Sequence, residues 1–160
     1  MPKPRGSDAR ARALRLLARA EQCRAKLRGK LLASGKEEAE ADADEIELLL
    51  DWLEAEGFLS DLRYATLRLK SRGPRMGDDK IRFELLKDGV DEAIIDEAFA
   101  ALAEEEVPDE AARCIAVRAK KFGDLPDSLE EKARQSRFLS QRGFSFASIR
   151  QALSKERADG

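Results

Sequence analysis

Three glycines recur at a fixed interval and constrain the fold of this chain more than any other feature. Gly35, Gly89 and Gly143 are separated by 54 residues each, and a leucine stands four positions before every one of them. Residues four and eight apart share one face of a helix, and glycine commonly ends a helix in the left-handed conformation. The interval therefore predicts tandem helical units. The leucines are Leu31, Leu85 and Leu139, and the residues eight before the glycines are Leu27, Ile81 and Gln135.

Each glycine-centred pair of helices follows another helical stretch, so the sequence predicts three units of three helices. The first helices are expected at 8–20, 61–73 and 109–123. Glycine, proline and capping residues cluster between these stretches and mark the boundaries. The predicted units are 1–57, 58–106 and 107–160. Because such small units have small cores, we expect neighbouring units to pack against each other and form an elongated, curved all-α array. The alternative is one irregular bundle with accidental spacing.

Polar residues at helix starts agree with this division. Asp91 and Ser145 stand two residues after their glycines, where a side-chain oxygen can cap the following helix. Ser128 and Glu131 have the spacing of a capping box. The third helix of the first unit differs, because its apolar residues begin about one turn later in the sequence.

The residue content argues against an enzyme. Histidine is absent, which removes the commonest general base and the commonest zinc ligand. Cys23 and Cys114 are far apart within helical patterns, so we expect reduced thiols in a cytoplasmic protein. No apolar run is long enough for a membrane span. The sequence therefore predicts no catalysis, no cofactor, no metal and no membrane contact.

Charge alternates along the chain in five blocks. Their net charges are +9 for 1–36, −11 for 37–62, +5 for 63–87, −10 for 88–112 and +5 for 113–160. First and second helices are basic, whereas the third helices of the first two units are acidic. The array could thus present basic and acidic faces to a partner. The alternative is pairing of these charges within the molecule, with a gain in solubility.

One nucleic-acid function is disfavoured by this charge. The stretch 85–99 resembles a helix-turn-helix, but residues 91–106 carry seven acids and no base. Phosphates would repel such a recognition helix, so reading of the major groove is not expected. Aromatic residues at mostly apolar positions are predicted to lie in the core rather than to stack on bases. These are Tyr64, Phe122, Phe144 and Phe146.

The motifs together resemble the RecX regulatory family. The matching stretches are LLARAEQCRAKLRGKLLASG, LDWLEAEGFLSDLRYA, IRFELLKDGVDEAIIDEAF and FLSQRGFSFASIRQAL, and the likeness runs from Arg10 to Leu153. The resemblance implies tandem three-helix repeats that bind the RecA filament on single-stranded DNA. It also implies suppression of ATPase, strand exchange and co-protease activity, from the filament's groove or its growing end. A monomer is expected.

Basic residues on the middle helices and around 68–75 are the candidates for filament or DNA contact. No family motif shows which of these residues makes a contact. Two other classes of function stay open: a protein–protein scaffold without a nucleic-acid role, and a free-standing DNA-binding regulator. The candidates are Arg24, Arg28, Lys30, Arg68, Lys70, Arg72, Arg75, Arg82, Arg134, Arg137 and Arg142.

Overall fold

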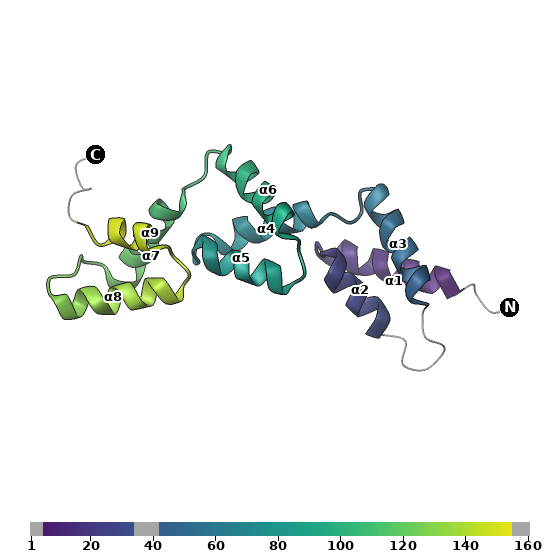
Figure 1. Cartoon of the computed structure of the whole chain (residues 1–160), viewed down its shortest axis with the longest axis horizontal. Helices are drawn as coiled ribbons and strands as arrows, with labels where there is room; N and C mark the ends of the chain where they lie inside the picture. Colours follow the sequence, from purple (N-terminus) through teal and green to yellow (C-terminus); the bar gives the residue numbers. More distant parts are fainter. Residues whose placement is uncertain (1–4, 34–41, 155–160) are drawn as a thin grey trace. The chain divides into compact units, whose positions relative to one another are not determined.

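The computed structural model describes residues 5–33 and 42–154, and within them the chain is helical with no strand (Figure 1). The prediction of an all-α fold is confirmed. The helices of this part are α1 (Arg5–Arg19), α2 (Arg24–Ala33), α3 (Ala43–Ala55), α4 (Asp61–Arg72), α5 (Asp78–Lys87), α6 (Glu92–Ala103), α7 (Glu110–Phe122), α8 (Leu129–Gln141) and α9 (Phe146–Ala152).

Internal contacts divide the chain into two compact units. The N-terminal unit combines residues 1–65 with 85–97, and the C-terminal unit combines 66–84 with 98–160. These units differ from the three predicted repeats, because α4, α5 and α6 each contribute residues to both. The repeat boundaries therefore stay a prediction.

Two of the three repeat glycines end a helix as predicted. Gly89 follows α5 with φ of 92° and Gly143 follows α8 with φ of 85°, a region that other residues disfavour. The residue after each glycine donates its backbone N–H to the leucine that stands four positions before that glycine. Val90 N–H donates to Leu85 O at 3.1 Å, and Phe144 N–H donates to Leu139 O at 3.2 Å. This is a Schellman motif, whose flanking positions favour apolar residues. The motif explains the recurrent leucine. Gly35 lies outside the described residues.

The predicted helix starts are also found. Ser145 Oγ accepts the N–H of Ser148 at the start of α9, and Ser128 Oγ accepts the N–H of Glu131 at 3.1 Å at the start of α8. Helix α6 begins directly after Asp91. The serine half of the predicted capping box is thus confirmed, while the Glu131 carboxylate accepts hydrogen bonds from the next turn of α8.

The recurrent leucines are buried, as predicted. Leu31, Leu85 and Leu139 are each at most 1% exposed. In the N-terminal unit an apolar cluster joins α1, α2 and α3, and its buried members are Ala13, Leu27, Leu31, Ile46, Leu50, Leu53 and Leu59. In the C-terminal unit a second cluster joins α7, α8 and α9, and its buried members are Cys114, Leu139, Phe144, Ile149, Ala152 and Leu153.

The prediction that the aromatic residues lie in the core holds for some of them and is wrong for Phe146. Tyr64 and Phe144 are buried, and Phe122 is half-buried with its ring edge-to-face against Phe138. Phe146 is 79% exposed. It lies in the first turn of α9, and that helix turns a different face, containing Ile149, toward the core.

Carboxylates at the first positions of α4 and α7 connect these helices to earlier ones. In the N-terminal unit, Asp61 Oδ1 accepts the backbone N–H of Arg24, the first residue of α2, at 2.7 Å. In the C-terminal unit, Glu110 Oε1 accepts the N–H of Asp78, the first residue of α5, at 3.0 Å. The first N–H groups of a helix lack partners in the helix and favour negative charge. The same capping device therefore occurs once in each unit.

A second contact recurs at the interval of the glycines. Cys23 Sγ lies 3.3 Å from Asp88 O, and the Gly77 N–H donates to Arg142 O at 2.8 Å. Gly77 follows Cys23 by 54 residues, and Arg142 follows Asp88 by 54. The interval thus spaces contacts between distant helices as well as helix ends.

Glu110, the first residue of α7, binds the starts of two other helices in the C-terminal unit. Besides the N–H of Asp78 at α5, its carboxylate accepts the hydroxyls of Ser145 at 2.8 Å and Ser148 at 2.6 Å, both at the start of α9. Burial by itself would raise the pKa of Glu110. The hydrogen bonds from Ser148, Ser145 and the Asp78 amide outweigh burial and hold the pKa below its ordinary value.

We expect Glu110→Gln to destabilise the protein by about 1.5–3 kcal/mol at neutral pH, the range for hydrogen bonds to a charged group. Because the folded-state pKa is lowered, this stabilisation is present above the ordinary carboxyl pKa of 4.5 and is lost as the pH falls below it. The wild type should therefore lose stability more steeply in acid than the variant. Urea melts from pH 7 to pH 3 measure this, with Glu130→Gln on the exposed start of α8 as the control. Parallel pH profiles for wild type and Glu110→Gln would contradict the assignment.

Candidate partner-binding surface

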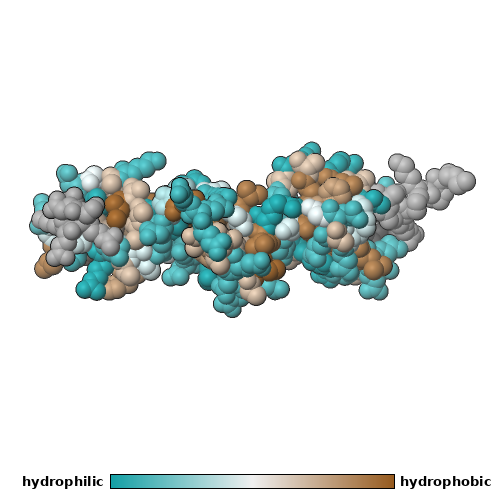
Figure 2. Space-filling view, turned by 90° about the horizontal axis from the view of Figure 1, so that it is seen from above, coloured by the Kyte–Doolittle hydropathy of each residue, from teal (hydrophilic) through white to brown (hydrophobic). Residues whose placement is uncertain are grey.

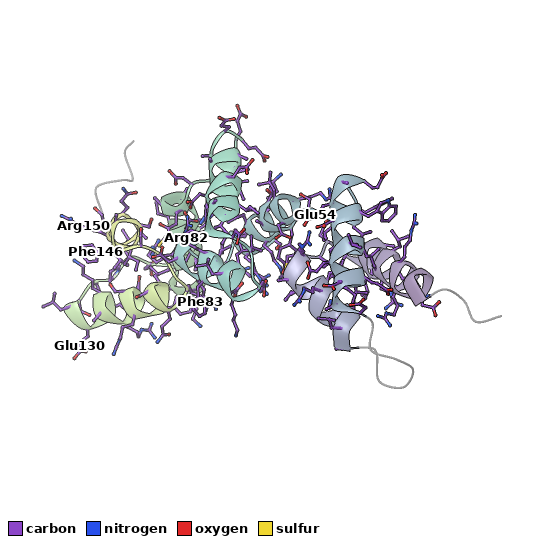
Figure 3. All side chains as sticks on the ribbon, turned by 45° about the vertical axis from the view of Figure 1, so that its right-hand side comes forward. Glu54, Arg82, Phe83, Glu130, Phe146 and Arg150 are labelled. Carbon is purple, nitrogen blue, oxygen red and sulfur yellow. The ribbon has the colours of Figure 1, made fainter. Side chains whose placement is uncertain are left out.

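Arg24 and Arg28, two of the predicted contact residues, face an acidic helix of their own unit. Arg24 forms three ion pairs at 2.8–3.0 Å with acids of α3, namely Glu47, Asp51 and Glu54. Arg28 also pairs with Glu47. The hydrogen bond that Arg24 donates to Glu47, followed by those that it donates to Glu54 and Asp51, holds the pKa of Arg24 above its ordinary value despite some desolvation. Its side chain is only 26% exposed. Arg24 is therefore not freely exposed, because α3 packs its acids against α2 (Figure 3 labels Glu54), and its role as a contact residue stays a prediction.

Most predicted contact residues of the C-terminal unit are also engaged. The ion pairs join Lys70 to Glu105 at 3.1 Å, Arg72 to Glu84 at 3.7 Å and Arg134 to Glu131 at 3.0 Å. The ring contacts place Arg82 over Phe99 and Arg142 over Phe138, each 5.0 Å from the centroid. Arg68 also interacts within the molecule. The side chains of Arg75 and Arg137 are exposed and form no ion pair or hydrogen bond with any residue that the structure describes.

These pairs account for part of the charge alternation. Basic α2 neutralises acidic α3 across a helix–helix contact, and Lys70 at the end of α4 meets Glu105 just after α6. Exposed pairs of this kind contribute little stability, on the order of 0–1 kcal/mol each. Pairing within the molecule, the alternative that the sequence left open, therefore applies to these residues.

A cationic hollow that the sequence analysis did not single out lies between α1 and α2 of the N-terminal unit. It encloses about 270 Å³, and the residues lining it are Arg12, Arg15, Leu16, Arg19 and Lys30. Only Lys30 was among the predicted contact residues. The signal was present in the sequence, because steps of three and four residues bring the three arginines to one face of a helix.

Apolar groups are also exposed in the C-terminal unit. A groove of about 500 Å³ lies among the end of α4, the end of α6 and the start of α7, lined chiefly by residues such as Leu69, Leu102 and Val107. Phe146 projects from α9 one turn before the exposed Arg150, and both are labelled in Figure 3. Figure 2 shows such apolar patches on a mostly hydrophilic surface.

The two thiols are free and buried, as expected. Burial raises the pKa of the Cys114 thiol to about 12, and burial also raises the pKa of Cys23, so both are poor nucleophiles at neutral pH. Among residues 8–33 and 42–154, histidine, cysteine and acidic side chains form no group that could hold a metal ion. No helix in the described part of the chain has the length and apolar character to cross a membrane.

Short capped helices pack around small apolar clusters, and cations gather at a hollow in the N-terminal unit, so the described part of the chain has the architecture of an all-α protein. Residues 109–153 match the family model described as RecX, third three-helix domain. A regulatory protein RecX from Herminiimonas arsenicoxydans is 39% identical over 144 residues, which cover 90% of this chain and 89% of that protein. The chain belongs to the RecX family of regulatory proteins.

Further comparisons extend this likeness to the fold. A regulatory protein RecX from Herbaspirillum seropedicae is 40% identical over 96% of this chain and 93% of its own length. The crystal structure of RecX from Lactobacillus salivarius superposes with a TM-score of 0.74, covering 93% of this chain and 94% of that one at 20% identity. The helical architecture is therefore shared with a solved member.

Proposed function

We propose that this protein regulates the RecA recombinase by binding the RecA–single-stranded DNA filament, in its groove or at its growing end. Binding suppresses ATPase, strand exchange and co-protease activity, and it takes place in the cytoplasm with one monomer as the binding unit. The observation that carries the proposal is family membership, since relatives named regulatory protein RecX align over about nine-tenths of the chain.

The surface chemistry supports a partner that offers both protein and phosphate. The net charge of −2 cannot by itself attract a polyanion. Cations with no ion pair, such as Arg75 and Arg137, together with the cationic hollow, offer local positive charge. The exposed apolar groove and Phe146 offer contacts to protein.

The direct test is RecA ATPase on single-stranded DNA, titrated with this protein. We expect substoichiometric inhibition of ATPase and of strand exchange, because a protein that acts on a filament affects many subunits at once. Unchanged rates over a broad titration would remove the proposal. Binding to bare strand, bare RecA and the assembled filament separates the alternatives. A scaffold binds RecA alone, a free-standing DNA regulator binds the strand alone, and the proposed regulator prefers the filament.

We expect Arg75→Glu combined with Arg137→Glu to weaken filament binding by about tenfold, since each contact with a phosphate contributes on the order of a kilocalorie per mole. These residues are preferred over Arg28 and Arg82 because reversing the latter would also break an ion pair and a ring contact within the molecule. Pull-down or anisotropy titrations with filament measure the change. Lys120→Glu with Lys132→Glu is the charge-matched control on other exposed positions. Equal affinities for both double variants would mean that Arg75 and Arg137 do not contact the filament.

A further inference from the structure

We propose that the cationic hollow of the N-terminal unit binds a backbone phosphate of single-stranded DNA. The proposal deepens the proposed function, because the strand is the one on which the filament forms. Three arginines of α1 and one lysine of α2 surround a single recess of about 270 Å³. The residue set is Arg12, Arg15, Arg19 and Lys30, with Leu16 as the apolar member.

Two cations of the hollow lack the neutralisation that Arg24 and Arg28 of the same unit receive. None of the residues lining the hollow is acidic. The side chains of Arg15 and Arg19 form no ion pair or hydrogen bond with any described residue, whereas Arg24 and Arg28 pair with the acids of α3. Like charges four residues apart on a helix repel by about 0.2–0.5 kcal/mol. An anion seated between them would convert this repulsion into attraction.

Two of the cations are held in position before any ligand arrives. The Arg12 guanidinium donates to Leu31 O at 2.9 Å, and Lys30 Nζ donates to Gln22 Oε1 at 3.0 Å. The Nε of Arg12 is buried and donates to no acceptor among the described residues. A site whose groups are already ordered loses less entropy on binding. Arg12 and Lys30 therefore form the fixed side of the hollow, and Arg15 and Arg19 form its adaptable side.

The size and donor set fit a phosphodiester. The guanidinium fork matches two phosphate oxygens at once. The volume of about 270 Å³ lies just under the roughly 300–1,000 Å³ of pockets that enclose whole small molecules, so it suits a phosphate with part of its sugar. Leu16 supplies an apolar surface for the sugar. A DNA strand carries one negative charge at every phosphodiester, so it also offers more negative charge to these four cations than a single protein carboxylate does.

The test measures binding of a fluorescent oligothymidylate to the full-length protein by anisotropy across a salt series. Each phosphate neutralised on a single strand adds about 0.7 to the log–log salt slope. We expect Arg15→Gln with Arg19→Gln to lower the slope by about 0.7, the contribution of the one phosphate in the hollow, and to weaken binding about tenfold at low salt. Lys120→Gln with Lys132→Gln, which removes the same charge elsewhere, should leave the slope unchanged. Trp52 fluorescence in denaturant confirms that each variant is folded, because this side chain packs on the core of the N-terminal unit.

A strand with neutral methylphosphonate linkages separates phosphate contact from other contacts. The wild type should lose affinity for it, and the double variant should lose much less, because the interacting charge is already gone. Equal losses for both proteins would overturn the proposal, as would an unchanged salt slope in the double variant or no salt-dependent binding by the wild type. If RecA inhibition fails while the slope difference persists, phosphate binding by the hollow is supported and the proposed function is refuted. If RecA inhibition persists without a slope difference, the proposed function is supported and phosphate binding by the hollow is refuted.

Discussion

Replacing Gly77 by alanine is expected to destabilise the protein by about 3 kcal/mol or more, because a Cβ there has no room. An alanine Cβ would overlap the carbonyl carbon and oxygen of Gly143 and the backbone N of Phe144. These are backbone atoms of the turn between α8 and α9, which cannot rotate aside as a flexible side chain can. The Gly77 N–H also donates to Arg142 O at 2.8 Å in the same turn. Urea melts followed by circular dichroism measure the loss.

Gly29 is the matched control, with an effect of opposite sign. It lies inside α2, and a Cβ built there meets no atom within 4 Å. Gly29→Ala should stabilise the protein by roughly 0.5–1 kcal/mol, since alanine loses less conformational entropy in a helix. A small effect at Gly77, similar in size to that at Gly29, would show that α5 does not approach the α8–α9 turn this closely.

Leu85→Ala is expected to destabilise the protein by about 2–5 kcal/mol, the range for emptying a filled core position. Leu85 is 1% exposed, and its carbonyl accepts the N–H of Val90 in the turn that ends α5. The substitution therefore removes buried apolar surface and loosens the packing beside the Schellman motif. The measurement is the free energy of unfolding in denaturant.

The neighbouring Leu86 supplies the comparison. It is 44% exposed, so Leu86→Ala should cost less than about 1 kcal/mol. The two leucines share a helix turn and a residue type, and they differ in the face that they occupy. Similar losses at both positions would refute the assignment of Leu85 to the buried face.

The helix ends and the buried leucines could be predicted because they depend on local interactions. A glycine that follows a leucine by four residues encodes a Schellman motif, and Ser128 and Ser145 encode caps, through bonds that span only a few residues. Phe146 was assigned wrongly by the same reasoning. Its local pattern is apolar, but which face of the short α9 turns inward depends on α7 and α8.

Sequence by itself determined the all-α class, the recurring helix ends and the burial of Leu31, Leu85 and Leu139, because backbone bonding and helical periodicity act over one or two turns. Tertiary structure alone decided which charges are available to a partner. Arg24 and Arg15 are both arginines in basic helices, yet α3 packs three acids against the first and none against the second. Tertiary structure also decided the hydrogen bonds of Glu110, whose serine partners lie 35 and 38 residues away in the sequence. Such contacts depend on how helices distant in sequence pack, and helical periodicity carries no information about that packing.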